Sequence, residues 1–215
     1  MRSGSTSGGS DRRHAWVLGV LLTMGLFATM ANAIEEPEYR VLQRYAGFEV
    51  REYPPYLVAE VRLPGPPNRA GNQGFRILAA YIFGKNRGER RIAMAAPVTQ
   101  VPVSTKIPMA APVMQSEAQG EYLIQFTIPR EYTLATVPEP TDPRIRLEQM
   151  PATRYAVIRY SGTWTDRNYR QHLDALRRDL LAAGLKSVGK PIYARYNAPF
   201  VPWFMRRNEI WLKLP

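Results

Sequence analysis

The most regular pattern of apolar residues lies in two segments that predict amphipathic helices. In the first segment, apolar side chains recur at intervals of three and four residues: Phe75, Leu78, Ala79 and Ile82. The second segment has the same spacing: Tyr169, Leu173, Leu176 and Leu180. This spacing places each set on one face of a helix. We predict a helix that follows a Pro/Gly loop at 64–71 and ends at Gly84, and a second helix over 166–183 with Asp166 as N-cap and Gly184 as stop.

Runs of β-type residues surround the two helices. Segments 39–45 and 48–63 join at Ala46-Gly47, and Pro54-Pro55 interrupts the second, which predicts a hairpin with a bulge or an edge bend. Further runs, mostly separated by Pro, Gly or Asn, predict strands at 92–103, 107–114, 122–128, 145–149, 154–160, 190–196 and 209–212.

The order of these elements repeats along the chain. A strand pair, a helix and two or more strands occur within 39–128, and the same order recurs within 145–212. We interpret this as a duplicated ββαββ unit. Two such units around one core predict an α+β domain, with a distorted antiparallel β-barrel or curved sheet flanked by two helices.

A shorter repeat lies inside the first half. Residues 91–100 recur as 106–115, with seven of ten positions identical. Two copies at this spacing are too few for a solenoid. Equivalent strands would place Met94 and Met109 in similar environments, and methionine adapts to irregular spaces. Both core packing and the lining of a pocket remain open for these side chains.

The N-terminal residues have the layout of a secretory signal. Polar, basic residues 1–14 precede an uncharged and mostly apolar run over 15–30, which ends in an A-x-A site at 31–33. We predict a signal peptide over 1–33, cleavage after Ala33 and a periplasmic or secreted protein. The alternative is a retained membrane anchor, although the run is shorter than the roughly 20 residues that a spanning helix needs. Arg12-Arg13 leaves the twin-arginine route open beside the general secretory route.

Composition excludes several kinds of site. The 215 residues are 45% hydrophobic, which argues against a disordered chain, and none is cysteine. Disulfides, zinc ribbons, iron–sulfur clusters and thiolate nucleophiles are therefore excluded. The formal net charge is +11, and removal of residues 1–33, with three arginines and one aspartate, leaves +9. We expect one domain over 34–215 and an anionic ligand or surface as partner, not nucleic acid, because an exported protein meets little of it.

Several ordered motifs resemble the SOUL haem-binding protein family. Residues 92–98 (IAMAAPV) are similar to its I-x-M-T-x-P-V segment, 48–53 to its early Y-E-I-R-x-Y strand and 75–86 to its first helix. Residues 195–199 and 206–211 are similar to its closing Y-N-P-P and R-R-N-E-V-W signature. The resemblance covers about 39–212 and implies a distorted antiparallel β-barrel with two helices, similar to bacterial effector-binding domains. Ala95 and Ala110 stand where the family usually has Thr, so each copy of the segment lacks that hydroxyl.

The resemblance implies non-covalent binding of haem or a related tetrapyrrole, which needs an apolar slot and cations for two propionates. We expect the slot between the first helix and the aromatic segment 200–205. The candidate cofactor-binding residues are Phe75, Ala79, Ile82, Met94, Trp203, Met205, Arg206 and Arg207. Each also has a plainer interpretation, in which the arginines form a solvated turn and the tryptophan anchors the core.

An axial iron ligand has weaker support. His172 is the one histidine after residue 33, and it lies at the margin of the second helix's apolar stripe. Some family members have been proposed to use a histidine on the early strand, where this sequence has Glu52. Met94, Met109, Met205 or a tyrosine remain chemically possible ligands, although the family also includes binders without a protein ligand. We expect no metal ligand from the protein, and binding through apolar contact and propionate pairing.

The sequence offers no familiar catalytic motif. It contains no G-x-S-x-G elbow, H-E-x-x-H pair, P-loop or Rossmann glycine pattern. The favoured hypothesis is a non-catalytic, monomeric, exported bacterial protein of the SOUL type, which carries or buffers a tetrapyrrole in the cell envelope. The alternatives are an effector-type module for another amphipathic anion, or an envelope protein that uses its basic surface on lipid or polymer.

Overall fold

One curved antiparallel sheet organises the chain in the computed structural model, which describes residues 34–103, 120–198 and 200–215. Its strands are β1 (Arg40–Arg44), β2 (Glu49–Tyr53), β3 (Tyr56–Pro64), β4 (Val98–Val103), β5 (Glu121–Thr127), β6 (Arg146–Met150), β7 (Thr153–Tyr160), β8 (Val188–Arg195) and β9 (Asn208–Lys213). Two α-helices and one short 3₁₀ turn accompany them: α2 (Pro67–Ile82), α3 (Asp166–Ala182) and η1 (Trp203–Met205). The α+β class predicted from the sequence is confirmed.

The strand order shows the duplication directly. The nine described strands lie in the order β1-β2-β7-β9-β8-β4-β5-β3-β6, and each neighbouring pair is antiparallel. One half is β2-β3-α2-β4-β5 and the other is β6-β7-α3-β8-β9. The halves meet at β4 and β8, and each lends its first strand to the other, because β2 pairs with β7 and β6 pairs with β3. The two ββαββ halves therefore form one continuous sheet.

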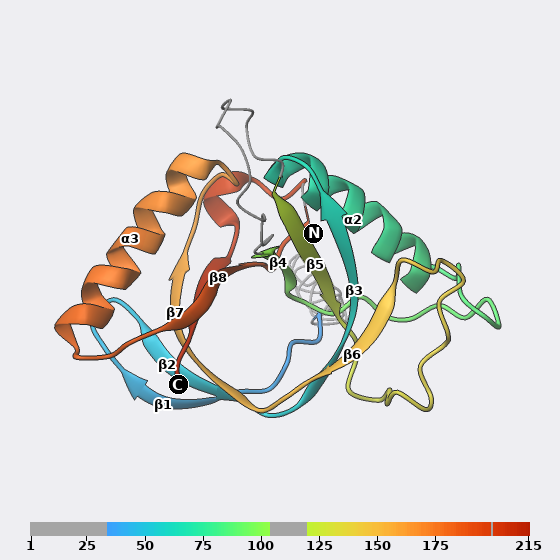
Figure 1. The fold of residues 1–215 in the computed structure, drawn as a ribbon, viewed down its shortest axis with the longest axis horizontal. Coiled ribbons are helices and arrows are strands. Elements are labelled where there is room, and N and C mark those ends of the chain that lie inside the picture. The colour runs from blue at the N-terminus through green and yellow to red at the C-terminus, as the bar shows by residue number, and fades with distance from the viewer. Residues whose placement is uncertain (1–33, 104–119, 199) are drawn as a thin grey trace, which may run out of the picture. The chain divides into compact units, whose positions relative to one another are not determined.

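Both helices cover the outer side of this sheet (Figure 1). The buried face of α2 packs on β3 and β5 through Leu78, Ala79 and Ile82. The buried face of α3 packs on β7 and β9 through Leu173, Leu176 and Leu180. Each half thus has its own helix-on-sheet core, as the spacing of apolar residues in the two helices requires.

The inner side of the sheet has a third cluster, which is largely aromatic. Ala156 and Ile158 face α3, so the alternating Tyr155 and Val157 face inward. The cluster comprises Tyr53, Ala96, Tyr155, Val157, Ala194, Tyr196 and Trp211. This face also buries charge, since Glu209 is 0% exposed and Arg51 is 4% exposed.

Glu209 is the centre of the buried charged network. Its carboxylate accepts hydrogen bonds from Arg51 Nη1 at 3.1 Å, Tyr196 Oη at 2.7 Å and Trp211 Nε1 at 2.8 Å. Arg207 Nη2 donates to the same carboxylate at 2.9 Å, and Arg207 Nη1 pairs with Glu36. Burial alone would raise the pKa of Glu209, but the charges of Arg51 and Arg207 hold the pKa below its ordinary value.

Some element boundaries differ from the predictions. Helix α2 begins at Pro67, inside the predicted loop at 64–71, because proline is pre-organised for the first helical position. Thr165, not Asp166, caps α3, and its side chain accepts a hydrogen bond from the Asn168 amide. Strand β4 begins at Val98 and not at residue 92, because among the described residues the segment before it forms only an isolated bridge, between Ala95 and Glu35.

Three predictions fall on residues outside the described ranges. These are the signal peptide over 1–33, the strand at 107–114 with Met109, and the second copy of the short repeat. Within the described residues no helix is long and apolar enough to cross a bilayer. The hairpin prediction is confirmed for β1 and β2, whose pairing shifts register between Val41 and Gln43.

Candidate functional site

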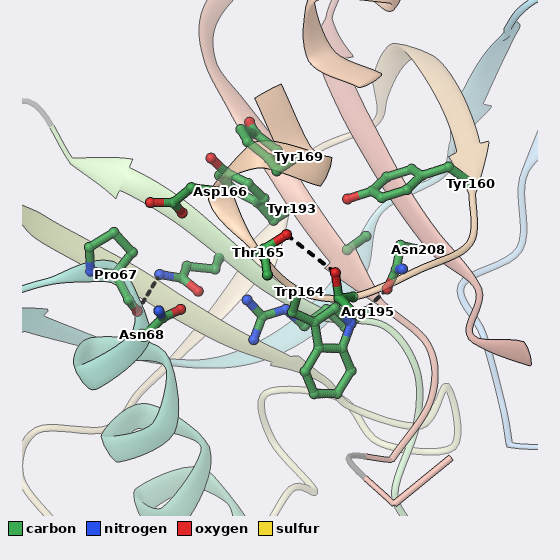
Figure 2. A pocket seen from close by; sticks show the side chains of 13 residues that line it. Pro67, Asn68, Tyr160, Trp164, Thr165, Asp166, Tyr169, Tyr193, Arg195 and Asn208 are labelled. Atoms are coloured by element: carbon green, nitrogen blue, oxygen red, sulfur yellow. Dashed lines mark hydrogen bonds between the residues drawn. The ribbon is translucent and has the colours of Figure 1, made fainter. Parts of the chain in front are cut away.

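Two adjoining hollows lie on the outer side of β4 and β8, between the starts of α2 and α3. The larger has a volume of about 280 Å³, and its walls are Gly71, Asn72, Phe75, Arg76, Val98, Gln100, Ile124, Trp164, Arg195 and Asn197. The smaller, of about 30 Å³, holds one water-sized space and is drawn in Figure 2. They share Gln100, Trp164 and Arg195. The site therefore lies where the two halves of the sheet meet.

Strand alternation directs the polar side chains into the hollows. Ala194 belongs to the inner cluster, so its neighbours Tyr193 and Arg195 face outward. On β4, Gln100 faces the same side, and its Nε2 donates to the carbonyl of Pro67 at 3.0 Å. That bond ties the start of α2 to the centre of the sheet, opposite the start of α3.

Arg195 is the most unusual group in the site. Its side chain is half-buried and lines both hollows, yet it makes no ion pair or hydrogen bond with any residue in the described ranges. Burial lowers the pKa of Arg195, and the nearby charge of Arg206 acts in the same direction. A guanidinium removed from water without a counter-charge is costly, so this position favours an anion.

Trp164 forms an apolar wall beside that cation. Its indole Nε1 donates to Asn208 Oδ1 at 2.8 Å, which fixes the ring. The guanidinium carbons of Arg206 and Arg195 lie 4.3 and 4.9 Å from the ring centre. Figure 2 shows Trp164 and Arg195 side by side, with the indole turned toward the viewer. The hollow thus combines an aromatic surface with the Arg195 side chain, and Arg206 stacks on the same ring at its edge.

Three tyrosines close the far end of the smaller hollow. Tyr160, Tyr169 and Tyr193 line it, and the rings of Tyr169 and Tyr193 stack. Burial raises the pKa of Tyr160 and of Tyr193 to about 12. These phenols are therefore neutral at physiological pH and add no negative charge next to Arg195.

Four of the predicted cofactor-binding residues lie on the first helix or shortly after it, and they divide between the site and the core. Phe75 lines the larger hollow. Ala79 and Ile82 lie in the hydrophobic cluster beneath α2, and Met94 packs against that cluster as a half-buried side chain. The structure therefore brings only Phe75 of these four to the hollow, and it places Met94 in the packing environment that the sequence left open.

The residues predicted from the C-terminal segment also separate. Trp203 and Met205 are exposed on η1. Arg206 stacks on Trp164 at the edge of the site, and its Nε donates to the carbonyl of Val201 at 2.8 Å. Arg207 turns to the inner side, where Glu209 and Glu36 bind it. The eight predicted residues do not meet in one cavity, and their contact with a cofactor stays a prediction.

His172 has a packing role on α3. Its Nδ1 donates to the carbonyl of Asn168 at 2.7 Å, and its ring stacks on Tyr160 at 4.2 Å. Glu52, at the position of the family's proposed histidine, pairs with Arg40 on the surface. The described residues contain no cluster of three or more His, Cys, Asp or Glu side chains that could hold a metal ion.

Sequence reasoning missed the residues that define the hollow. Arg195 stood inside a quoted motif, but the alternation of β8 is needed to show that it faces outward. Trp164 and Arg76 carried no signal, because Trp164 lies in the loop before α3 and Arg76 lies on the polar side of α2. Gln100 could have been found only from the pairing of β4 with β8.

Several solved structures have a similar fold. The crystal structure of the EcmrR C-terminal domain has a TM-score of 0.58 at 11% identity, and the alignment covers 82% of this chain and 98% of that one. A crystal structure of a hydrolase from Listeria innocua has a TM-score of 0.53 at 12% identity and covers 80% of this chain and 94% of that one. At these identities the likeness concerns the fold alone, and it agrees with the curved antiparallel sheet and two helices predicted from the sequence.

Sequence comparison is more specific. Heme-binding protein 2 of Homo sapiens is 28% identical over 188 residues, which is 85% of this chain and 87% of the relative. Heme-binding protein 1 of Xenopus tropicalis is 26% identical over 165 residues, or 76% of this chain and 82% of the relative. The sequence model described as "SOUL heme-binding protein" matches residues 34–213, which span every described strand and both helices. The chain therefore belongs to the SOUL heme-binding protein family.

Proposed function

We propose that this protein binds haem or a related tetrapyrrole non-covalently in the larger hollow, without catalysing a reaction. Arg195 carries the proposal, because it is a half-buried cation beside the apolar walls of the larger hollow and has no anionic partner in the described ranges. A propionate of a tetrapyrrole would supply the missing charge and accept bidentate hydrogen bonds from the guanidinium.

The other walls suit an amphipathic planar ligand. Phe75, Val98 and Trp164 offer apolar surface, and exposed Arg76 offers a second cation for a second propionate. The volume of about 280 Å³ is close to the lower end of ligand pockets, roughly 300 Å³. The hollow would therefore enclose one edge of a macrocycle and leave the opposite edge in solvent.

Binding of this kind does not need a protein ligand to iron. The described walls of the larger hollow include no imidazole, thioether or phenol. When bound, haem would supply the redox and ligand chemistry of its iron, whereas Arg195 and Arg76 would orient its propionates. Metal-free protoporphyrin is therefore expected to bind about as tightly as hemin.

The predicted signal peptide supports a place in the cell envelope. If residues 1–33 are removed on export, the binding domain carries a net charge of +9 and would meet its ligand outside the cytoplasm. We propose that it carries or buffers tetrapyrrole there.

A hemin titration of the chain from Ile34 to Pro215 tests the proposal. Wild-type protein is expected to show a saturable Soret shift and quenching of its tryptophan fluorescence. Arg195→Gln is expected to weaken binding about tenfold, because a hydrogen bond to a charged group contributes about 1.5–3 kcal/mol. Arg178→Gln, at an exposed position on α3 outside both hollows, is the matched control and should bind as wild type does.

Two results would reject the proposal. The first is a wild-type protein without a Soret shift, and the second is an Arg195→Gln variant that binds hemin as tightly as the control. A bile acid that displaces hemin at far lower concentration would instead assign the hollow to a different amphipathic anion.

A further inference from the structure

The turn at residues 200–205 exposes an apolar surface that the folded domain does not use. Phe200 is 88% exposed, Phe204 61% and Met205 65%, and Trp203 is 57% exposed. These four are among eleven exposed large hydrophobic residues in the described ranges, and the other seven lie scattered over several elements. We call residues 200–205 the aromatic turn. Single exposed apolar residues are ordinary, but a contiguous group usually marks an interaction surface.

The backbone of the aromatic turn is held in place by hydrogen bonds. The Gly162 amide donates to the carbonyl of Trp203 at 3.0 Å, and the Met205 amide donates to the carbonyl of Pro202 at 2.9 Å. Arg206 Nε donates to the carbonyl of Val201 at 2.8 Å. Trp203, Phe204 and Met205 are therefore presented by a hydrogen-bonded 3₁₀ turn, so ordering them on contact with a partner would cost little backbone entropy.

The segments beside the aromatic turn are strongly basic. The turn is bonded to Gly162 in the segment that leads into α3, and Arg206 at its end stacks on Trp164. Residues 66–76, 160–170 and 195–207, which meet at the hollows, contain seven arginines and one acidic residue, Asp166. Arg207 is neutralised by Glu209 and Glu36, but the exposed Arg167 and Arg170 form no ion pair with any described residue. The first turn of α2 contains no acidic residue.

We propose that the aromatic turn docks on an anionic lipid bilayer. Tryptophan and phenylalanine are suited to the interface between headgroups and acyl chains, and the surrounding arginines would bind anionic headgroups. The positive charge of this surface favours an anionic bilayer as its partner over a second copy of the chain, because self-association through this face would bring two arginine-rich surfaces together. The proposal is independent of haem binding, although it would place the hollow next to the membrane.

Vesicle co-sedimentation with the chain from Ile34 to Pro215 tests docking. This segment contains every described strand, helix and hydrophobic cluster, and it lacks the apolar N-terminal run that would itself bind lipid. Wild-type protein is expected to bind vesicles of phosphatidylcholine with about one third phosphatidylglycerol, and to bind neutral phosphatidylcholine vesicles at least about tenfold more weakly. Raising the salt from about 0.05 to 0.5 M should release it.

The variant Trp203→Ala with Phe204→Ala should lose about tenfold or more of the binding to anionic vesicles. Its matched control is Phe83→Ala with Leu181→Ala, which removes two exposed apolar side chains elsewhere and should bind as wild type does. Hemin titration of both variants separates this proposal from the proposed function, because docking can fail while hemin still binds.

Three results would overturn docking on lipid. One is equal binding of wild-type protein to neutral and anionic vesicles, and another is an equal loss in the control variant. The third is a wild-type dimer in solution that the Trp203→Ala, Phe204→Ala variant dissolves, which would assign the aromatic turn to contact between copies of the chain.

Discussion

Three arginines close together in the sequence have three different surroundings. Arg195 lines the hollows without an ion pair in the described ranges, Arg206 stacks on Trp164, and Arg207 binds the buried Glu209. Their identity and spacing predicted cations near a ligand, but not which of these arginines can pair with an anionic ligand. Which arginine can bind a ligand depends on the carboxylates that the fold brings near each one. Glu209, which neutralises Arg207, lies within the same 206–211 motif as the two arginines.

At the residue scale we predict that the buried carboxylate of Glu209 stabilises the fold. Glu209→Gln removes the fully buried carboxylate that binds Arg51 and Arg207 and leaves Arg51 only its ion pair with the partly exposed Glu49, so the free energy of unfolding should fall by about 3–5 kcal/mol in urea denaturation at pH 7. Because the pKa of Glu209 is lowered on folding, its stabilising effect is present above the unfolded pKa and is lost as the pH falls through the folded value. The difference between wild type and variant should therefore shrink below about pH 4.

The surface pair of Arg40 and Glu52 supplies the control. Glu52→Gln removes an exposed salt bridge and should change the free energy of unfolding by less than about 1 kcal/mol. A Glu209→Gln variant no less stable than this control, or a difference that does not depend on pH, would contradict the assigned role of Glu209.

At the scale of elements, helix α2 shows how closely the outer layer packs. Gly74 lies on its buried face, and an added Cβ would stand 2.8 Å from the Cβ of Ile124 on β5. Such a distance is too short for two carbon atoms, so glycine at this position permits the helix to approach the sheet. The same approach brings Phe75 and Arg76 to the wall of the hollow.

Gly74→Ala is expected to destabilise the protein even though alanine favours helix. The intrinsic gain is about 1 kcal/mol, whereas overpacking against Ile124 costs about 1–3 kcal/mol and displaces the helix. Thermal unfolding followed by circular dichroism should show a lower Tm than wild type. Gln73→Ala, at the adjacent exposed position of the same helix, should not lower the Tm. A Gly74→Ala variant more stable than Gln73→Ala would contradict the close packing.

At the scale of the whole molecule, the site lies where the two duplicated halves meet. The central pair β4 and β8 comes from equivalent positions of the two halves, and the starts of the two equivalent helices flank it. The halves differ in the side chains they contribute, since Val98 and Gln100 face outward on β4 and Tyr193 and Arg195 face outward on β8. A near-symmetric frame therefore holds an asymmetric, cationic hollow.

For the whole chain we predict that residues 1–33 are removed on export. Expression in a bacterium with intact export is expected to yield a protein whose first residue is Ile34, as read by mass spectrometry of the N-terminus. Replacing Ala31 and Ala33 by leucine should block cleavage, because signal peptidase needs small side chains at both positions. Recovery of wild-type protein with residues 1–33 still attached would contradict the prediction.

The sequence by itself determined the family, the α+β class, the duplicated order of elements and the apolar face of each helix. These features depend on local periodicity and on motifs whose residues are close together in the chain. The boundaries of helices and strands were predicted less accurately where local signals conflict. Pro67 is an example, because it lies in a Pro/Gly-rich segment and also begins a helix.

Only the tertiary structure decided which residues share a hollow and which charges are neutralised. Arg195, Trp164 and Phe75 come from a strand, a loop and a helix far apart in the sequence, and the order of the strands and the packing of α2 on the sheet bring them together. Met94 and Ile82 are equally apolar in the sequence, yet they pack into the core and not into the hollow. Burial and pairing are properties of the assembled sheet, so local pattern cannot specify them.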